Sequence, residues 1–222
     1  MQTASQERTV AWLPAISPRQ ATVFLLVTHA AGVIGLLVPS SRTLFQWATP
    51  FHLLMTVALL LYFHSDWRIS FRVLIGGVML IGYWVEVIGV HTSLIFGDYT
   101  YDTTLGIKVL DVPLMIAVNW LLLTYICGSV CSRLSGNVFY KVVLAALIMV
   151  GLDYLIEPVA IAYDFWHWTT TTPPLHNYLG WLAVALLVQA LFFGLSFRKA
   201  NPLALPVLVI QIAFFSLLQL IT

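Results

Sequence analysis

Long apolar stretches alternate with short polar ones along the whole chain. Seven of these stretches reach the roughly 20 residues that an α-helix needs to cross the hydrocarbon core of a bilayer. Helices are expected because a backbone surrounded by lipid satisfies its hydrogen bonds within its own segment. The predicted spans are residues 20–38, 44–63, 71–90, 112–131, 138–163, 177–196 and 203–221. The pattern therefore predicts an all-α fold, a polytopic transmembrane helical bundle of seven spans in which residues 1–222 form a single integral membrane domain.

Composition supports the same class of protein. Hydrophobic residues make up 60% of the chain and charged residues 9%, whereas soluble domains carry about 25% charged residues. The net charge of +1 gives no indication of a nucleic-acid partner. The first apolar stretch has no clear cleavage site and further spans follow it, so it is interpreted as a helix of the bundle and not as a secretory signal peptide. Cys127 and Cys131 lie one helical turn apart in a span and are expected to be buried thiols.

The basic residues predict the orientation of the bundle. If the spans alternate in direction, one side of the membrane receives Arg8, Arg19, Arg68, Arg72, Arg133, Lys141, Arg198 and Lys199. The other side receives only Arg42 and Lys108. Because basic residues favour the cytoplasmic side, the N-terminus is expected in the cytoplasm and the C-terminus outside, in the cell (inner or plasma) membrane.

The acidic residues have the opposite distribution. Most of them fall in the outer half of the spans or in the outer connections, namely Glu86, Asp98, Asp102, Asp111, Asp153, Glu157 and Asp164. The rule for basic residues does not require this distribution, because acidic residues contribute little to it. We therefore expect the carboxyl groups in the outer half of the protein to have a function.

Six polar side chains are expected at a similar depth, in the middle to outer part of the bilayer. Counting about 1.5 Å per residue from the helix ends, this layer contains His29, His52, Glu86, Asn119, Asp153 and Glu157. A polar layer across several spans is typical of a functional site. Asp153 and Glu157 share one face of a helix because they are four residues apart. Pro158 removes a backbone hydrogen bond and is expected to bend that helix beside the two acids.

Each of these features also has a purely structural interpretation. The carboxyl pair could join two helices by hydrogen bonds with one member protonated, and buried histidines and Asn119 are common in helix packing. Several tryptophans lie at the ends of spans and are interpreted as an aromatic belt at the membrane interface, namely Trp47, Trp67, Trp166 and Trp168. An acid inside the membrane nevertheless favours a functional interpretation, because burying it there is costly.

The usual catalytic motifs are absent from the sequence. It contains no glycine-rich phosphate loop, no G-x-S-x-G and no H-E-x-x-H motif. It also lacks the clustered histidines of membrane di-iron oxygenases. The last span, 203–221, contains no lysine, which excludes a retinal Schiff base of the rhodopsin kind.

The remaining chemistry is acid catalysis in an apolar pocket. A carboxylic acid buried away from water keeps its proton, and a second acid beside it strengthens this preference. Such a donor can protonate an isolated alkene in a hydrophobic, polyene-like substrate that lies in the bilayer. Aromatic faces can stabilise the resulting carbocation. The candidates for this role are Tyr83, Trp84, Trp120 and Tyr154. No metal or other cofactor is needed.

Three segments resemble the carotenoid biosynthesis membrane protein family, which includes the carotenoid 1,2-hydratases and the bisanhydrobacterioruberin hydratases. They are EVIGVHTSLIFGDYTYDTTLGIKVLDVPLMIAVNW at 86–120, LDYLIEPVAIAYDFWHW at 152–168 and PLHNYLGW at 174–181. The resemblance implies addition of water across the terminal C1=C2 double bond of an acyclic carotenoid end group. The implied partners are a lipophilic carotenoid, water, the lipid bilayer and other membrane enzymes of carotenoid synthesis.

The resemblance also implies which residues form the site. The acidic motifs of the family fall on Glu86, Asp98, Asp153 and Glu157, and its amides on Asn119 and Asn177. We expect Asp153, the deeper acid of its pair, to be the general acid. Glu157 or Glu86 would orient the water or accept its proton. His91 and His167 are expected to connect the site to bulk water, together with Asp164.

Three alternatives remain open at this point. A lycopene-type cyclase would protonate the same bond, and an internal alkene would then capture the cation. An iron-dependent carotene-cleaving oxygenase would hold its metal with His29, His52, His91 and His176. A carotenoid-binding or transport protein would use the acids as a proton relay and leave its ligand chemically unchanged.

Overall fold

The computed structural model describes residues 16–170 and 172–221, and Arg8 lies outside this part of the chain. It contains seven helices that are long and apolar enough to cross a membrane, as the sequence predicts. They are α1 (Pro18–Leu37), α2 (Pro39–Tyr62), α3 (Ile69–Thr92), α4 (Leu114–Ser132), α5 (Val138–Ala162), α6 (Leu175–Gly194) and α7 (Ala204–Ile221). The predicted spans agree with these helices to within a few residues at each end.

Local sequence chemistry sets several of the helix ends. Ser17 caps α1 with a capping box that includes Gln20, and Pro18 occupies the first turn, where its missing N–H is not needed. Asn137 caps α5 by accepting a hydrogen bond from the Tyr140 backbone. Ser93 ends α3 in the left-handed conformation, with φ of 55°. Helix α5 continues through Pro158 to Ala162, so the proline does not end it.

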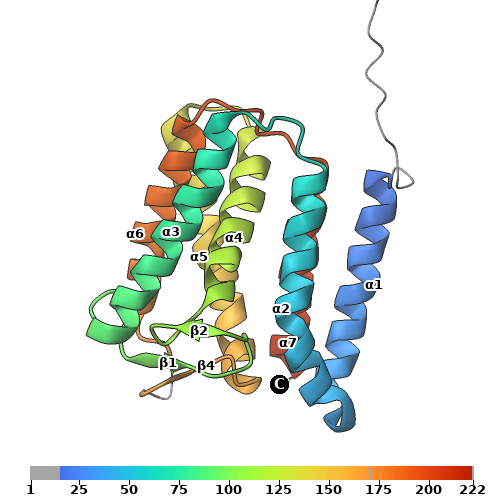
Figure 1. Ribbon diagram of the computed structural model, residues 1–222, viewed down its shortest axis with the longest axis vertical. Helices are drawn as coiled ribbons and strands as arrows, with labels where there is room; N and C mark the ends of the chain where they lie inside the picture. The colour runs from blue at the N-terminus through green and yellow to red at the C-terminus, as the bar shows by residue number, and fades with distance from the viewer. Residues whose placement is uncertain (1–15, 171, 222) are drawn as a thin grey trace, which may run out of the picture.

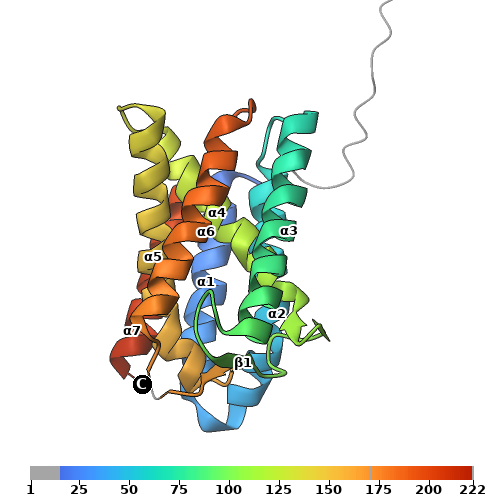
Figure 2. The same ribbon diagram turned by 90° about the vertical axis from the view of Figure 1, so that its left-hand side faces the viewer.

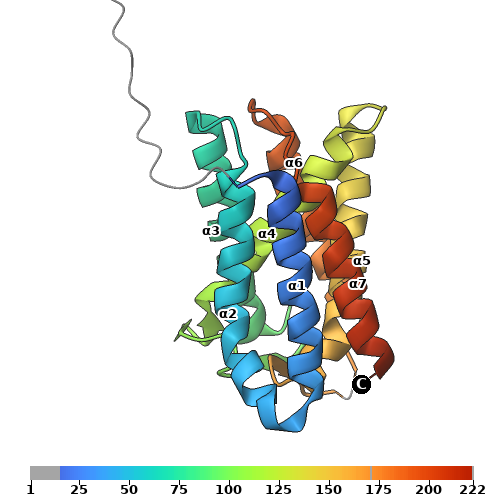
Figure 3. The ribbon, with the colours of Figure 1, turned by 90° about the vertical axis from the view of Figure 1, so that its right-hand side faces the viewer.

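Helix α4 is the centre of the bundle. It packs against α2, α3, α5, α6 and α7, and 78% of its most apolar window is buried, the largest share among the seven helices. Figure 1 shows α3 and α6 on one side of α4, α5 crossing behind it, and α1, α2 and α7 on the other side. Figure 3 shows α1 between α2 and α7, both of which it contacts.

The two long connections form short strands, which the sequence pattern does not predict. Strand β1 (Tyr99–Tyr101) pairs antiparallel with β4 (Trp166–Trp168), and β2 (Lys108–Val109) pairs with β3 (Val112–Pro113). The strands gather at one end of the bundle, which is also the end where the described chain finishes (Figures 1 and 2). They add two small two-stranded sheets to the all-α bundle.

The β1–β4 pair presents aromatic side chains to the bundle. Tyr99 lies opposite Trp168 and Tyr101 opposite Trp166, and both tyrosines are buried. Thr100 and His167, the middle pair, are exposed. This alternation follows from the two-residue period of a strand. We call Tyr99, Tyr101, Trp166 and Trp168 the aromatic strap.

Candidate active site

Three buried carboxyl groups border one small cavity inside the bundle. Glu86 comes from α3, and Asp153 and Glu157 from α5. The cavity has a volume of about 30 Å³. Its other polar or aromatic lining residues are Phe96, Tyr99, Tyr101, Asn119, Trp120, Trp166, Trp168, Asn177 and Trp181. The acids of the predicted polar layer therefore meet at one place, together with the aromatic strap.

Glu86 receives three side-chain hydrogen bonds. The hydroxyl groups of Tyr99 and Tyr101 donate to its Oε2 at 2.5 and 2.8 Å. The indole N–H of Trp120 donates to its Oε1 at 3.1 Å. Burial raises the pKa of both phenols, and the nearby Glu86 carboxylate raises it further, so the two tyrosines keep the protons that they donate. This set of donors matches an ionised carboxylate, which only accepts hydrogen bonds.

Glu157 also receives three hydrogen bonds, two of them from the other half of the aromatic strap. The indole N–H groups of Trp166 and Trp168 donate to its Oε2 at 3.0 and 2.9 Å, and the Asn177 amide donates to its Oε1 at 3.1 Å. The interpretation of these two tryptophans as interfacial belt residues is therefore wrong. They lie near a span end, but the strand turns their N–H groups inward onto a buried acid.

Asp153 differs from the other two acids in its partners. Its carboxyl group accepts one hydrogen bond among the described residues, from the Asn177 amide at 3.3 Å. Asn177 thus bridges the two acids of α5 from the neighbouring helix α6. Asp153 is 1% exposed, so bulk water does not replace the missing donors.

Two tryptophans pack flat against each other behind the acids. The rings of Trp120 and Trp181 have centroids 4.2 Å apart and are inclined by 17°. Gly82 on α3 makes room for this arrangement, because a Cβ atom there would lie 2.4 Å from the Trp120 ring. The glycine lets α3 approach α4 closely enough for Trp120 to reach Glu86.

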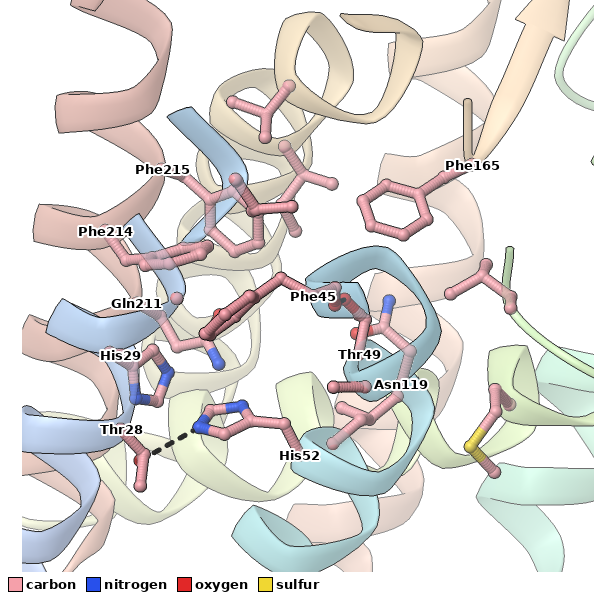
Figure 4. Close-up of a pocket in the computed structure, with 18 of the residues that line it drawn as sticks. Thr28, His29, Phe45, Thr49, His52, Asn119, Phe165, Gln211, Phe214 and Phe215 are labelled. Carbon is pink, nitrogen blue, oxygen red and sulfur yellow. Dashed lines mark hydrogen bonds between the residues drawn. The ribbon is translucent and has the colours of Figure 1, made fainter. Parts of the chain in front are cut away.

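A second and much larger cavity adjoins the first. It has a volume of about 320 Å³, and Ile116, Asn119 and Trp166 line both cavities. Most of its lining is apolar and includes Phe45, Phe165, Phe214 and Phe215 (Figure 4). The arrangement combines a lipophilic chamber with a small polar one, and such pairing of apolar walls with a few polar groups is typical of ligand sites.

Six of the residues predicted for the site line the small cavity, and six do not. The first group is Glu86, Asn119, Trp120, Asp153, Glu157 and Asn177. Trp84 and Tyr154 are 51% and 58% exposed on the outside of the bundle, because each is turned around its helix from the nearest acid. Tyr83 donates its hydroxyl proton to the Val109 carbonyl oxygen at 2.6 Å. These three aromatic residues border neither cavity.

The other three predicted residues lie at the strand end of the bundle, away from both cavities. Asp98 is exposed. His91 lies 3.5 Å from Asp111. His167 lies 3.4 Å from Asp102 and 3.7 Å from Asp164, on the face of β4 opposite to Trp166 and Trp168. His167 therefore contacts two aspartates at the surface and none of the three buried carboxyl groups that border the small cavity.

Sequence reasoning missed three of the side chains that face the acids, namely Tyr99, Tyr101 and Trp181, and assigned Trp166 and Trp168 to the interface. One signal was present in the connections. Both Y-T-Y at 99–101 and W-H-W at 166–168 place aromatic residues two positions apart, a spacing typical of a strand with one buried face.

The four histidines considered for an iron site do not come together. His29 and His52 have ring centroids 4.4 Å apart, whereas His91 and His176 lie at the strand end, where His176 bonds to the Leu94 carbonyl oxygen. Among the described residues, no three His, Cys, Asp or Glu side chains are grouped so that they could hold a metal ion.

Comparison with known proteins places the chain among its relatives. Residues 47–222 match the carotenoid biosynthesis protein family. The chain is 31% identical over 132 residues to bisanhydrobacterioruberin hydratase of Haloarcula japonica, an alignment that covers 55% of this chain and 44% of the relative. It therefore spans less than half of that relative's length. No solved structure shows significant similarity. Since the family match covers most of the chain, the protein belongs to the carotenoid biosynthesis protein family.

Proposed function

We propose that this protein is a carotenoid hydratase that adds water across the terminal C1=C2 double bond of an acyclic end group. One observation carries the proposal, namely that a small cavity lined by three carboxyl groups adjoins a large apolar cavity. Membership of the family supports a carotenoid substrate, and the relative with a hydratase name supports the type of reaction.

The unequal hydrogen bonding of the acids supports separate roles for them. Glu86 and Glu157, with three donors each, are the carboxylates. Asp153, with a single amide donor, carries the proton and is the general acid. Two buried carboxylates nearby make a third negative charge unfavourable, which keeps Asp153 neutral until an alkene takes its proton.

The proposed reaction balances without a cofactor. Asp153 protonates C2, and the π electrons of the double bond form the new C–H bond. The positive charge then lies on the tertiary carbon C1. A water molecule bonds to C1 through oxygen and gives one proton to Glu157 or Glu86. The return of that proton to Asp153 restores the enzyme, so alkene and water become one tertiary alcohol.

The two cavities suit the two reactants. A polar cavity of about 30 Å³ has room for a water molecule, with Asn119 and Asn177 among its hydrogen-bonding groups. The large cavity accommodates the apolar end group. Trp166 lines both cavities, and the Trp120–Trp181 pair borders the small one. The faces of these rings stabilise the cation, a role that we transfer to them from Tyr83, Trp84 and Tyr154.

The seven apolar helices support a multi-pass membrane protein, and we propose that the strand end lies outside the cytoplasm. Helix direction alternates, so most of the basic residues in the described chain fall at the opposite end, near the connections 63–68, 133–137 and 195–203. The positive-inside rule assigns that end to the cytoplasm. The acids then lie in the outer half of the bilayer.

Carotenoid analysis by mass spectrometry tests the function. Cells that make lycopene are grown in water labelled at its oxygen atom, with and without the protein. A hydratase gives a product heavier by one labelled water per modified end. An isomer of unchanged mass and shortened chromophore would instead identify a cyclase and overturn the proposal. The Asp153→Asn protein, expressed to the same level, is the matched control and is expected to give neither product.

A further inference from the structure

One wall of the large cavity carries polar side chains that the proposed reaction does not use. His29 comes from α1, His52 from α2 and Gln211 from α7. The two imidazole rings lie edge to face, with centroids 4.4 Å apart. Figure 4 shows the Gln211 side chain pointing toward both rings. The same view places Asn119, at the junction with the acid cavity, on the opposite side.

Polar atoms of all three residues lack a protein partner. His29 uses Nδ1 to bond the Leu25 carbonyl oxygen at 2.8 Å, and His52 uses Nε2 to bond the Thr28 hydroxyl at 3.0 Å. The second nitrogen of each ring and the Gln211 side-chain amide have no hydrogen bond to any residue of the described chain. His29 is 5% and Gln211 8% exposed. A hydrocarbon in the cavity would leave these buried groups unpaired, which costs free energy.

The lining of the cavity defines the chemistry of a suitable ligand. Lysine, arginine, aspartate and glutamate do not occur among the residues that border it, so a charged ligand would find no counter-ion. The remaining wall is mostly aliphatic and phenylalanine, which fits an isoprenoid chain. The proton of His29 lies on Nδ1, which bonds a carbonyl oxygen. The Thr28 hydroxyl donates to the Leu25 carbonyl oxygen and so accepts from His52 Nε2. The free nitrogen of each ring therefore accepts a hydrogen bond, whereas the Gln211 amide can donate and accept. A ligand hydroxyl can use both kinds of group, and a ligand carbonyl oxygen can use the amide N–H.

We infer that His29, His52 and Gln211 form a subsite that binds a hydroxyl or carbonyl oxygen on a neutral isoprenoid ligand. The inference rests on the proposed function only in taking the large cavity as the ligand chamber. The oxygen subsite is built by α1, α2 and α7, none of which contributes a residue to the small cavity. The preferred ligand of this chamber is therefore an isoprenoid that already carries oxygen, not a pure hydrocarbon.

A binding measurement tests the subsite without any turnover. The full-length Asp153→Asn protein in lipid discs is equilibrated with radiolabelled farnesol, an acyclic isoprenoid alcohol, or with farnesene, an acyclic hydrocarbon of the same carbon number. Binding to protein-free discs is subtracted for each ligand. Because a buried hydrogen bond changes affinity by about tenfold, farnesol is expected to bind about tenfold more tightly than farnesene.

Matched variants identify the groups responsible. Gln211→Leu, a change well tolerated in an apolar helix, is expected to bring farnesol to the level of farnesene without weakening farnesene. His52→Leu is a second variant in case Gln211→Leu fails to fold. Gln219→Leu makes the same exchange on the same helix outside the cavity and is expected to keep the preference.

Equal binding of both ligands to the Asp153→Asn protein would overturn the inference, as would a farnesol preference that survives both Gln211→Leu and His52→Leu. The result is independent of the hydration assay. If the unmodified protein hydrates no carotenoid in cells but Asp153→Asn still prefers farnesol, only the proposed function is rejected. Hydration of a hydrocarbon carotenoid with no farnesol preference rejects only the subsite.

Discussion

At the scale of single residues, three acids of similar chemistry have different surroundings. Glu86 and Glu157 each receive three hydrogen bonds, and Asp153 receives one. Carboxyl groups that perform different roles in one site are commonly distinguished in this way by their surroundings. The donors, more than the acids themselves, define the proposed division between proton donor and proton acceptor.

Replacing Asp153 by asparagine tests that division. Asn has nearly the same shape but no acidic proton, so Asp153→Asn is expected to lower the hydration rate at least about 100-fold while the protein still folds. Product per mole of membrane-inserted protein is the measurement. Asp98→Asn is the control, because Asp98 is another acid predicted for the site but borders neither cavity. Equal losses in the two variants would remove Asp153 from the role of general acid.

The acids themselves can be found from the sequence, but most of their partners cannot. A carboxyl group inside an apolar stretch is rare enough to be noticed, and helical periodicity places Asp153 and Glu157 on one face. Side-chain direction is harder to predict, because Trp84 and Tyr154 lie close to an acid in the chain but face away from it. The oxygen subsite combines three helices, and its polar residues are common in ordinary helix packing.

At the scale of elements, the aromatic strap joins segments that are far apart in the chain. Tyr101 and Trp166 are partners across the β1–β4 pair, and the pair supplies two donors to Glu86 and two to Glu157. Strands of three residues produce almost no hydrophobic pattern, and their pairing depends on how the helices position the connections. The sequence therefore predicts the seven helices but not the strands that cover the acids.

The packing of α3 against α4 gives a prediction about Gly82. A Cβ atom there would lie 2.4 Å from the Trp120 ring, so Gly82→Ala is expected to displace Trp120 from Glu86. The cost of overpacking is about 1–3 kcal/mol of stability, and hydration is expected to fall as well. Thermal unfolding and product formation are measured together on the purified protein.

Gly76 provides the control on the same helix. A Cβ atom at Gly76 meets nothing within 4 Å, and alanine is the better helix former. Gly76→Ala is therefore expected to be neutral or slightly stabilising. If both variants melt at the wild-type temperature, the close approach of α3 to Trp120 does not constrain the site.

Asp102, the residue directly after β1, gives a prediction about the pH dependence of stability. The backbone N–H of Thr103 donates to its carboxylate, which lowers the pKa of Asp102 against the opposing effect of partial burial, and His167 lowers it further. Because the pKa is lower in the folded protein, the stabilisation is complete above the ordinary aspartate range and is lost as pH falls through the lower folded value. The melting temperature of wild type is thus expected to fall below about pH 4.

Asp102→Asn removes this titrating contact and is expected to show a smaller fall in melting temperature over the same acid range. Asp98→Asn, which removes another exposed carboxyl from the same end of the bundle, is expected to follow the wild-type curve. Asp102 does not contribute to the pH dependence of stability if the melting temperatures of Asp102→Asn and wild type fall in parallel down to about pH 3.

At the scale of the whole molecule, the proposed orientation can be tested with two single cysteines. Thr103 is exposed at the strand end and Ser135 at the opposite end, whereas the native Cys127 and Cys131 are buried. In intact cells, Thr103→Cys is expected to react with a membrane-impermeant maleimide. Ser135→Cys is expected to react only after permeabilisation. The reverse result would put the strand end in the cytoplasm and contradict the positive-inside assignment.

The two cavities are built mostly by different helices, and this has a consequence for how the substrate specificity of such a protein can change. The acid cavity is built from α3 to α6 and the aromatic strap, whereas more than half of the residues around the large cavity belong to α1, α2 and α7. The family match begins at residue 47, so α1 with His29 lies outside it. We expect mutations in α1, α2 and α7 to change which lipid is accepted while the proposed acid site stays intact, and directed evolution of new specificities should begin there.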